Sequence, residues 1–235
     1  MTKGWRQNSW VIPVSAVMLA TLIISVPPFL RFDPARQPAQ LNQTHPTLDF
    51  ALAEAHVLLA TGAIVTLCLG IWPWLRIRFP AVHRWSGRVY VFSALSASLL
   101  ILPIVYLNNS WQADIGAGAT GACWFVTTLI GYLAIRQGNE VRHRRWMLYS
   151  FAMATSVVWG VVLTHLFPNP AQFPYMLETL RWVGPLFNLG AVKWWLDRTA
   201  ARAATATTRG ETESSGAVVQ FPASSPADHI RKRAA

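Results

Sequence analysis

The sequence predicts an all-α integral membrane protein, a bundle of six transmembrane helices with both ends in the cytoplasm. The first observation is composition: 53% of the residues are hydrophobic and only 13% are charged, whereas a soluble domain carries about 25% charged residues. The second is that the apolar residues gather in long runs, and the third is that Lys and Arg lie unevenly between these runs. The net charge of +10 therefore belongs to loops beside a membrane, and we expect no nucleic-acid partner.

Six segments are apolar enough to cross a bilayer, which requires ~20 mostly apolar residues. The predicted spans are residues 10–30, 50–72, 87–107, 117–136, 146–167 and 180–197. We interpret the first as a retained helix and not as a cleaved signal peptide, because its apolar stretch is long and no A-x-A cleavage site follows it. The sixth is the least regular, since it is short and contains Pro185 and Asn188.

The basic residues indicate how these spans are oriented. With six crossings, 17 of the 20 Lys and Arg residues lie on the side of the two termini and 3 lie on the other side. Basic residues concentrate in cytoplasmic loops, so both termini are predicted to be cytoplasmic. The bilayer itself is then the first partner of the chain.

The predicted domain organisation has three parts. Residues 1–9 form a cytoplasmic N-terminus, residues 10–197 form the transmembrane domain with a core at 50–197, and residues 198–235 form a tail. The tail is rich in Ala, Thr, Ser and Pro and has no sustained apolar period. Such a segment cannot bury enough surface to offset its ordering entropy, so we predict that it is disordered.

Two similar polar clusters stand at the starts of apolar helices, in "AVHRWSGRVY" and, 60 residues later, in "VRHRRWMLYS". At this offset His83 falls on His143 and Arg84 falls on Arg144. Two neutral imidazoles on facing helices are a suitable axial pair for the iron of haem b. Arg84, Arg88 and Arg144 are candidate partners of the haem propionates, through charge-assisted hydrogen bonds. Electrons would then come from and go to a quinone or a redox partner protein.

The same clusters also fit a structural interpretation. Arginine side chains reach lipid phosphate from a helix end, and the nearby Trp85 and Trp146 suit the interfacial belt of a membrane. The alternative is therefore a non-catalytic membrane protein, transporter-like or an assembly partner, anchored by these clusters. The sequence leaves open whether the protein is an enzyme, and no catalytic motif such as GxSxG or HExxH is present.

Two further histidines form a second tier of candidates. His56 lies inside the second predicted span, and His165 closes the fifth. His143 and His165 are 22 residues apart on one predicted helix, so their side chains would point within ~40° of each other. His56 and His165 together are candidates for a second ligand pair or for part of a quinone or proton site.

The stretches "HRWSGRVYVFSA", "RHRRWMLYSFAMA" and "RWVGPLFNLGAVKWWL" resemble a bacterial membrane family called domain of unknown function 2306. The resemblance covers about residues 50–197 and implies a location in the bacterial inner membrane. One departure is Tyr149, where members of that family tend to carry Arg.

"VHRWSGRVYVF" also looks like the opening of the third helix in transmembrane ferric reductases and NADPH oxidases. That resemblance implies that His83 and His143 ligate an inner haem in a six-helix domain. Those families carry a second histidine about four turns further along each of these helices, where this chain has Ala97 and Val157. The resemblance therefore implies one haem at most.

Overall fold

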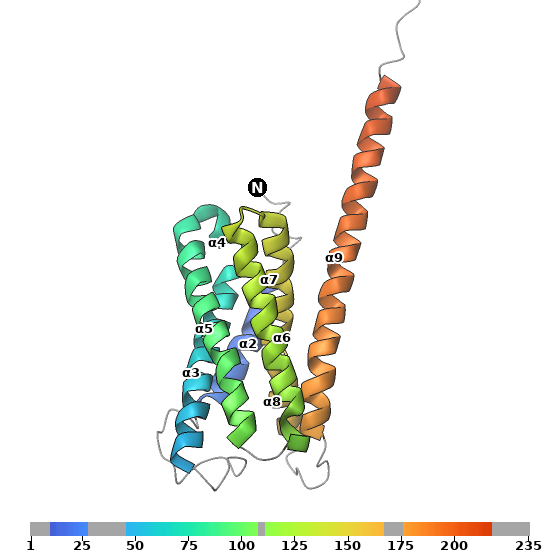
Figure 1. Ribbon diagram of the computed structural model, residues 1–235. Coiled ribbons are helices and arrows are strands. Elements are labelled where there is room, and N and C mark those ends of the chain that lie inside the picture. Colours follow the sequence, from blue (N-terminus) through green and yellow to red (C-terminus); the bar gives the residue numbers. More distant parts are fainter. Residues whose placement is uncertain (1–9, 28–45, 108–110, 167–175, 218–235) are drawn as a thin grey trace, which may run out of the picture. The chain divides into compact units, whose positions relative to one another are not determined.

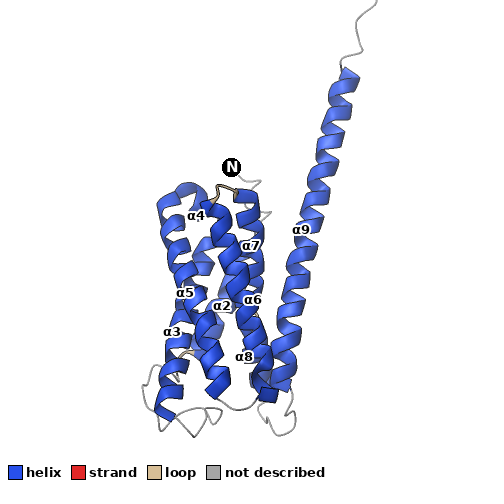
Figure 2. Ribbon diagram, viewed as in Figure 1, coloured by secondary structure: helices blue, strands red, loops and turns tan. Residues whose placement is uncertain are grey.

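The computed structural model describes residues 10–27, 46–107, 111–166 and 176–217, and each regular element in these ranges is an α-helix (Figure 1, Figure 2). The predicted all-α class is therefore confirmed. Contacts divide the chain into two compact units, Met1–Val192 and Lys193–Ala235. All residues proposed for a site from the sequence belong to the first unit.

The helices follow the predicted apolar segments with some changes at the edges. They are α2 Val11–Ser25, α3 Pro46–Gly70, α4 Pro73–Arg78, α5 Pro80–Leu107, α6 Trp111–Arg136, α7 Glu140–Ala154, α8 Val157–Leu166 and α9 Met176–Ala217. Within the described ranges, three segments are long and apolar enough to cross a membrane, namely Thr47–Gly70, Pro80–Leu107 and Ile115–Arg136, and α2 is a shorter apolar helix. The chain is thus a multi-pass membrane protein, and six spans with a cytoplasmic N- and C-terminus stay a prediction.

Short connections make antiparallel neighbours of these long helices. α3 packs along α5, α5 along α6, and α6 along α7 (Figure 1). Between α6 and α7 the chain turns at Gly138, whose φ of +74° is a conformation that glycine adopts without a steric cost. Asn139 then caps α7, because its side-chain oxygen accepts a hydrogen bond from the backbone N–H of Arg142.

The core of the first unit is made largely of small side chains. Ala63, Ala94, Ala97 and Ala152 are fully buried between the helices, around the larger Tyr90. Long apolar side chains instead cover the outside of the helices, for example Ile23, Phe92 and Leu186, each more than 60% exposed. Small residues let helix backbones approach closely in a membrane, where lipid solvates the long apolar side chains.

The fifth predicted span is not one helix. The prediction of a continuous helix over 146–167 was wrong, because α7 ends at Ala154 and α8 begins at Val157. At the break, the hydroxyl of Thr155 donates to the carbonyl of Phe151, and that of Ser156 donates to the carbonyl of Met153. Hydroxyl groups that bond to backbone carbonyls in this way compete with helical bonding and bend or interrupt a helix.

Asn188 of α9 satisfies the groups that this break leaves open. Its Nδ2 donates to the Ala152 carbonyl and to Thr155 Oγ1, both at 3.1 Å. Its Oδ1 accepts from the indole N–H of Trp159 at 3.1 Å. A broken helix is tolerated in a membrane when side chains of neighbouring helices bond the freed backbone groups, and Asn188 does so here.

The sixth predicted span, 180–197, lies within a longer helix. α9 begins at Met176, contains Pro185 and continues to Ala217. Residues 198–217 are therefore helical, where the composition predicted a disordered tail. The segment is rich in Ala, which has the highest helix propensity. The predicted disorder rested on low hydrophobicity alone and did not take this propensity into account. Residues 218–235 lie outside the described residues.

Candidate functional site

The two predicted histidines lie at one end of the first unit, which we call the basic end. Here α4 connects α3 to α5, and α6 turns into α7 (Figure 1). The end carries Arg76, Arg78, Arg84, Arg88, Arg136, Arg142, Arg144 and Arg145. His83 lies in the first turn of α5 and His143 in the first turn of α7, and they are within range of electrostatic interaction with each other.

His143 is oriented by a backbone contact with α6. Its Nδ1 lies 2.8 Å from the carbonyl oxygen of Gly131. Because a carbonyl only accepts, Nδ1 carries the proton, and a neutral ring then keeps its lone pair on Nε2. A side chain at Gly131 would place Cβ 2.8 Å from Met147 Sδ, so glycine at this position permits the close approach of α6 and α7.

His83 has a different environment. The residue is half-buried, and its Nδ1 is a buried nitrogen without a hydrogen-bond partner. The hydroxyl of Ser86 donates to the backbone carbonyl of His83 and not to the ring. The ring therefore has unused hydrogen-bonding capacity in a partly apolar place.

The arginines near these rings are exposed. Arg84, together with Arg76, lies within electrostatic range of His83. The Arg88 guanidinium instead lies over the ring of Trp85, 4.9 Å from its centroid, and Trp85 is 65% exposed. Arg144 is also exposed. The roles proposed for Arg84, Arg88 and Arg144 at a propionate stay predictions.

Tyr149, where the resemblance described above predicts Arg, lies one turn after Arg145. The guanidinium of Arg145 lies 5.9 Å from the centroid of the Tyr149 ring, and its Nε donates to the phenol oxygen at 3.4 Å. Tyr149 also packs edge-on against Trp146. The aromatic residue thus holds a neighbouring basic side chain at this end.

A buried hydrogen-bond network lies two turns further inside, and the sequence analysis missed it. Tyr90 and Ser150 stand seven residues after His83 and His143, and their hydroxyl oxygens are 2.5 Å apart. Two α6 side chains complete the network: Thr128 Oγ1 is 2.6 Å from Ser150 Oγ, and Trp124 Nε1 donates to the Tyr90 hydroxyl at 3.2 Å. The 60-residue offset that aligns the histidines also aligns Tyr90 with Ser150.

The network connects α5, α6 and α7 with each polar group bonded. Its four members, Tyr90, Trp124, Thr128 and Ser150, are all buried. Polar groups in an apolar interior are costly unless they are hydrogen-bonded, so the network favours one relative arrangement of the three helices. It thereby holds the helices that carry His83 and His143.

The second-tier histidines lie on two different helices, α3 and α8. Nδ1 of His56, on α3, lies 2.9 Å from the carbonyl oxygen of Ala97 on α5. His165 is on α8, and its side chain lies outside the described residues. The prediction that His143 and His165 lie on one continuous helix was wrong, because α7 ends at Ala154 and α8 begins at Val157; that the two side chains share a face stays a prediction.

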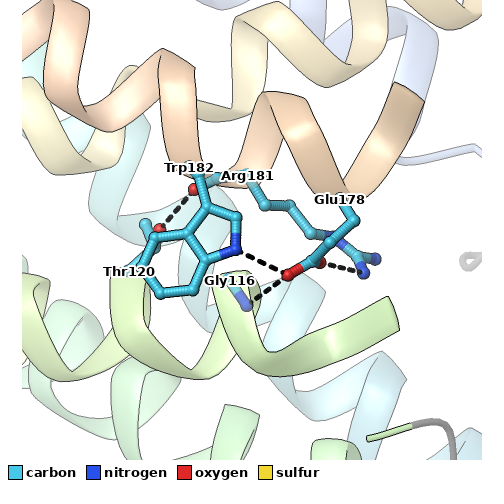
Figure 3. Close-up of polar contacts among 5 residues, drawn as sticks. All are labelled: Gly116, Thr120, Glu178, Arg181 and Trp182. Carbon is cyan, nitrogen blue, oxygen red and sulfur yellow. Dashed lines mark hydrogen bonds and ion pairs between the residues drawn. The ribbon is translucent and has the colours of Figure 1, made fainter. Parts of the chain in front are cut away.

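The opposite end of the first unit is where α3, α6 and α9 begin. There the carboxylate of Glu178, on α9, accepts hydrogen bonds from the backbone N–H of Gly116 on α6 and from Nε1 of Trp182, both at 2.8 Å (Figure 3). Arg181 pairs with the same carboxylate at 3.7 Å, and the hydroxyl of Thr120 donates to the Arg181 carbonyl (Figure 3). This contact attaches the start of α9 to the start of α6.

Among the residues that the structure describes, no group of three or more His, Cys, Asp or Glu side chains is placed to hold a metal ion. The assignment of His83 and His143 as haem ligands stays a prediction.

Comparison with known proteins is informative at the level of the family. A family model described as "Predicted membrane protein (DUF2306)" matches residues 53–195, more than half of the chain. No curated protein and no solved structure matches. The matched region includes His83, His143 and the buried network of Tyr90, Trp124, Thr128 and Ser150.

Proposed function

The chain is a member of the DUF2306 family of predicted membrane proteins, and for this multi-pass membrane protein we propose haem b electron transfer, with His83 and His143 as the residues that would hold the haem iron. Electrons pass to or from a quinone or a redox partner protein. The membrane is the bacterial inner membrane, and both termini are cytoplasmic, as the distribution of basic residues favours.

The observation that carries the proposal is the contact between His143 Nδ1 and the Gly131 carbonyl oxygen. The Nδ1–H donates to this carbonyl, which leaves the Nε2 lone pair of the ring for a ligand. Histidine ligands of metals commonly donate their other ring N–H to a backbone carbonyl, because this fixes the ring and raises its basicity. The Nδ1 of His83 has no partner within the protein, so that ring is not committed to another contact.

The surroundings of the two rings also fit a group with an apolar body and an acidic edge. Both histidines are half-buried at the start of apolar helices. A Cβ built at Gly87, four residues after His83, would meet no atom within 4 Å, so there is open space beside this turn. Arg84 and Arg144 adjoin the histidines in sequence, and their positive charge suits carboxylate groups at the membrane surface.

Haem b, when bound, supplies reversible one-electron chemistry at its iron. His83 and His143 would hold the group through their ring nitrogens. The Gly131 carbonyl orients the His143 ring, and the buried network keeps α5 and α7 in place.

The test is an absorption spectrum of the detergent-purified full chain, air-oxidised and then dithionite-reduced, with haem quantified per chain. We expect a sharp reduced α band in the wild type, and we expect both His83→Ala and His143→Ala to lose it. His229→Ala, outside the residues matched by the family model, is the control and should keep the wild-type spectrum. A colourless wild type after expression with ample haem supply would overturn the proposal, as would two unchanged His→Ala spectra.

A second candidate function rests on a different observation. The stacked and exposed pair of Arg88 and Trp85 has the form of a lipid-interface anchor. On this alternative the protein is non-catalytic, transporter-like or an assembly partner. His83→Gln and His143→Gln then cost little, whereas removal of the arginines at the basic end changes insertion or orientation, which reporter fusions at both termini measure.

A further inference from the structure

Asp49 is a buried carboxylate without a partner. It lies in the first turn of α3, at the opposite end from His83 and His143, and is 4% exposed. Both of its carboxylate oxygens are buried, and neither has a hydrogen-bond partner. Glu178, at the same end, has two N–H donors and an arginine for its carboxylate (Figure 3). The two carboxylates therefore differ: Glu178 has two N–H donors on Oε1 and an arginine facing Oε2, whereas neither oxygen of Asp49 has a hydrogen-bond partner.

An open carboxylate in this position requires positive charge. An ionised carboxylate that leaves water without a compensating donor or cation is strongly disfavoured. The N-terminus of α3 contributes roughly half a positive charge, which does not balance a full negative one. In the described part of this end the basic side chain is Arg181, and it pairs with Glu178.

The neighbouring groups do not supply the missing charge. On α3 itself, Glu54 is acidic and has a buried oxygen without a hydrogen-bond partner. The Nδ1 of His56 forms a hydrogen bond with the Ala97 carbonyl. Of the helices packed against α3, α2 contains no titratable residue, and the half of α5 near this end contains Tyr106, which is 69% exposed. The other two, α4 and α7, carry their arginines at the basic end. Ionisable residues at membrane depth commonly mark ion or proton pathways.

We propose that Asp49 is the anionic residue of a binding site for one monovalent cation, a proton or Na⁺, at the end of the first unit opposite His83 and His143. One carboxylate balances one positive charge. His56 lies seven residues further along α3, so the two side chains are on the same face, two turns apart, with the buried Ala53 between them. The cation enters from the end at which α3 begins, and this site is independent of the haem proposal.

The experiment uses a hydrophobic carbodiimide, dicyclohexylcarbodiimide, on the full chain in detergent. This reagent adds to a carboxyl group only when that group is protonated and in apolar surroundings. Peptide mass spectrometry locates the adduct, with choline chloride as the reference salt and pH varied from acid to alkaline. We expect an adduct at residue 49, its loss to background in Asp49→Asn, and no comparable adduct at Glu140, an exposed carboxylate that also lies in the first turn of its helix.

The two cations give different results. For a proton site, the adduct at Asp49 falls as pH rises and is the same in NaCl and in choline chloride. For a Na⁺ site, NaCl suppresses the adduct at a fixed pH and choline chloride does not. Either result supports a monovalent-cation site. An absence of adduct at residue 49 at every pH in choline chloride overturns it, as does an equal yield at Asp49 and Glu140.

Thermal unfolding provides a second measurement that does not depend on reagent access. A cation that binds the folded chain raises its Tm with concentration. The wild type should therefore show a Tm that shifts with pH or with Na⁺ against choline, and Asp49→Asn should lose that shift. Equal shifts in the wild type and in Asp49→Asn would contradict the proposal even if both proteins fold well.

Discussion

At both ends of the first unit a side chain from another helix forms a hydrogen bond with the backbone of α6. The side chain is a donor at one end and an acceptor at the other. At the basic end, His143 donates to the carbonyl of Gly131, and at the opposite end, Glu178 accepts from the N–H of Gly116. Each end also contains a polar group without a partner, the ring nitrogen of His83 and the carboxylate of Asp49. In each case a glycine on α6 lets a neighbouring helix approach closely enough for its side chain to bond the backbone.

The ends differ in whether the bonded side chain keeps an atom that can bind a ligand. His143 keeps a ring lone pair after its contact, so the basic end pairs an oriented base with the unbonded ring of His83. Glu178 accepts two N–H donors on Oε1 and faces Arg181 with Oε2, whereas Asp49 has no hydrogen-bond partner on either oxygen. This difference is why we propose a ligand that binds through ring nitrogens at one end and a cation at the other.

The largest effect is expected from adding a methyl group at the two α6 glycines. In Gly131→Ala the new Cβ lies 2.8 Å from Met147 Sδ, and in Gly116→Ala it lies 2.9 Å from Glu178 Oε1 and from Arg181 Cβ. Each change should lower the free energy of unfolding by about 1–3 kcal/mol, the usual cost of overpacking. Denaturant or thermal unfolding of the purified variants measures this loss.

The variants Gly131→Ala and Gly116→Ala also test whether only the basic end affects haem binding. Gly131→Ala displaces the partner of His143 and should lower the haem content per chain, whereas Gly116→Ala should leave it unchanged. Gly118→Ala is the matched control on α6, because a Cβ there would meet no atom within 4 Å. Equal haem loss in Gly131→Ala and Gly116→Ala would mean that the basic end has no special role.

A smaller effect is expected at the buried network. Ser150→Ala removes the hydroxyl to which both Tyr90 and Thr128 bond. An unpaired buried polar group costs about 1–3 kcal/mol, and the hydroxyl groups that are left can partly re-pair, so we expect a loss near the lower limit. Thermal unfolding measures it. Thr127→Ala, on the adjacent position of α6 and bonded within its own helix, should change the Tm less. A larger fall in Tm for Thr127→Ala than for Ser150→Ala would show that the network does not hold the helices together.

The smallest effect is expected from Glu178→Gln. The amide keeps a carbonyl oxygen for the N–H groups of Gly116 and Trp182 and loses only the charge that faces Arg181. A partly exposed ion pair at 3.7 Å contributes about 0–1 kcal/mol, so stability should fall by no more than that. Glu178→Ala, which removes the acceptor as well, should cost more in the same unfolding measurement. Equal losses in the two variants would show that the charge is what holds α9 to α6.

Much of the helical organisation was predictable because it depends on local sequence. The long apolar runs predicted α3, α5 and α6, and the positions of His83 and His143 at helix starts followed from where those runs begin. The break at Thr155 was not predictable from hydropathy, since the residues on both sides are equally apolar. What stabilises it is Asn188, more than thirty residues away in the chain. The helical segment 198–217 was missed for a local reason, its alanine content.

The sequence by itself determined that the chain is a multi-pass helical membrane protein with two basic, histidine-bearing helix starts, because hydropathy and charge are properties of each segment alone. Only the tertiary structure decided which polar groups are bonded and which are open. The sequence contains Asp49 and Glu178 as two similar carboxylates near helix starts, and it contains no sign that one would meet Gly116, Trp182 and Arg181 while the other meets none. That difference arises from the packing of helices distant in sequence, and burial without a partner is what gives a single carboxylate its chemistry.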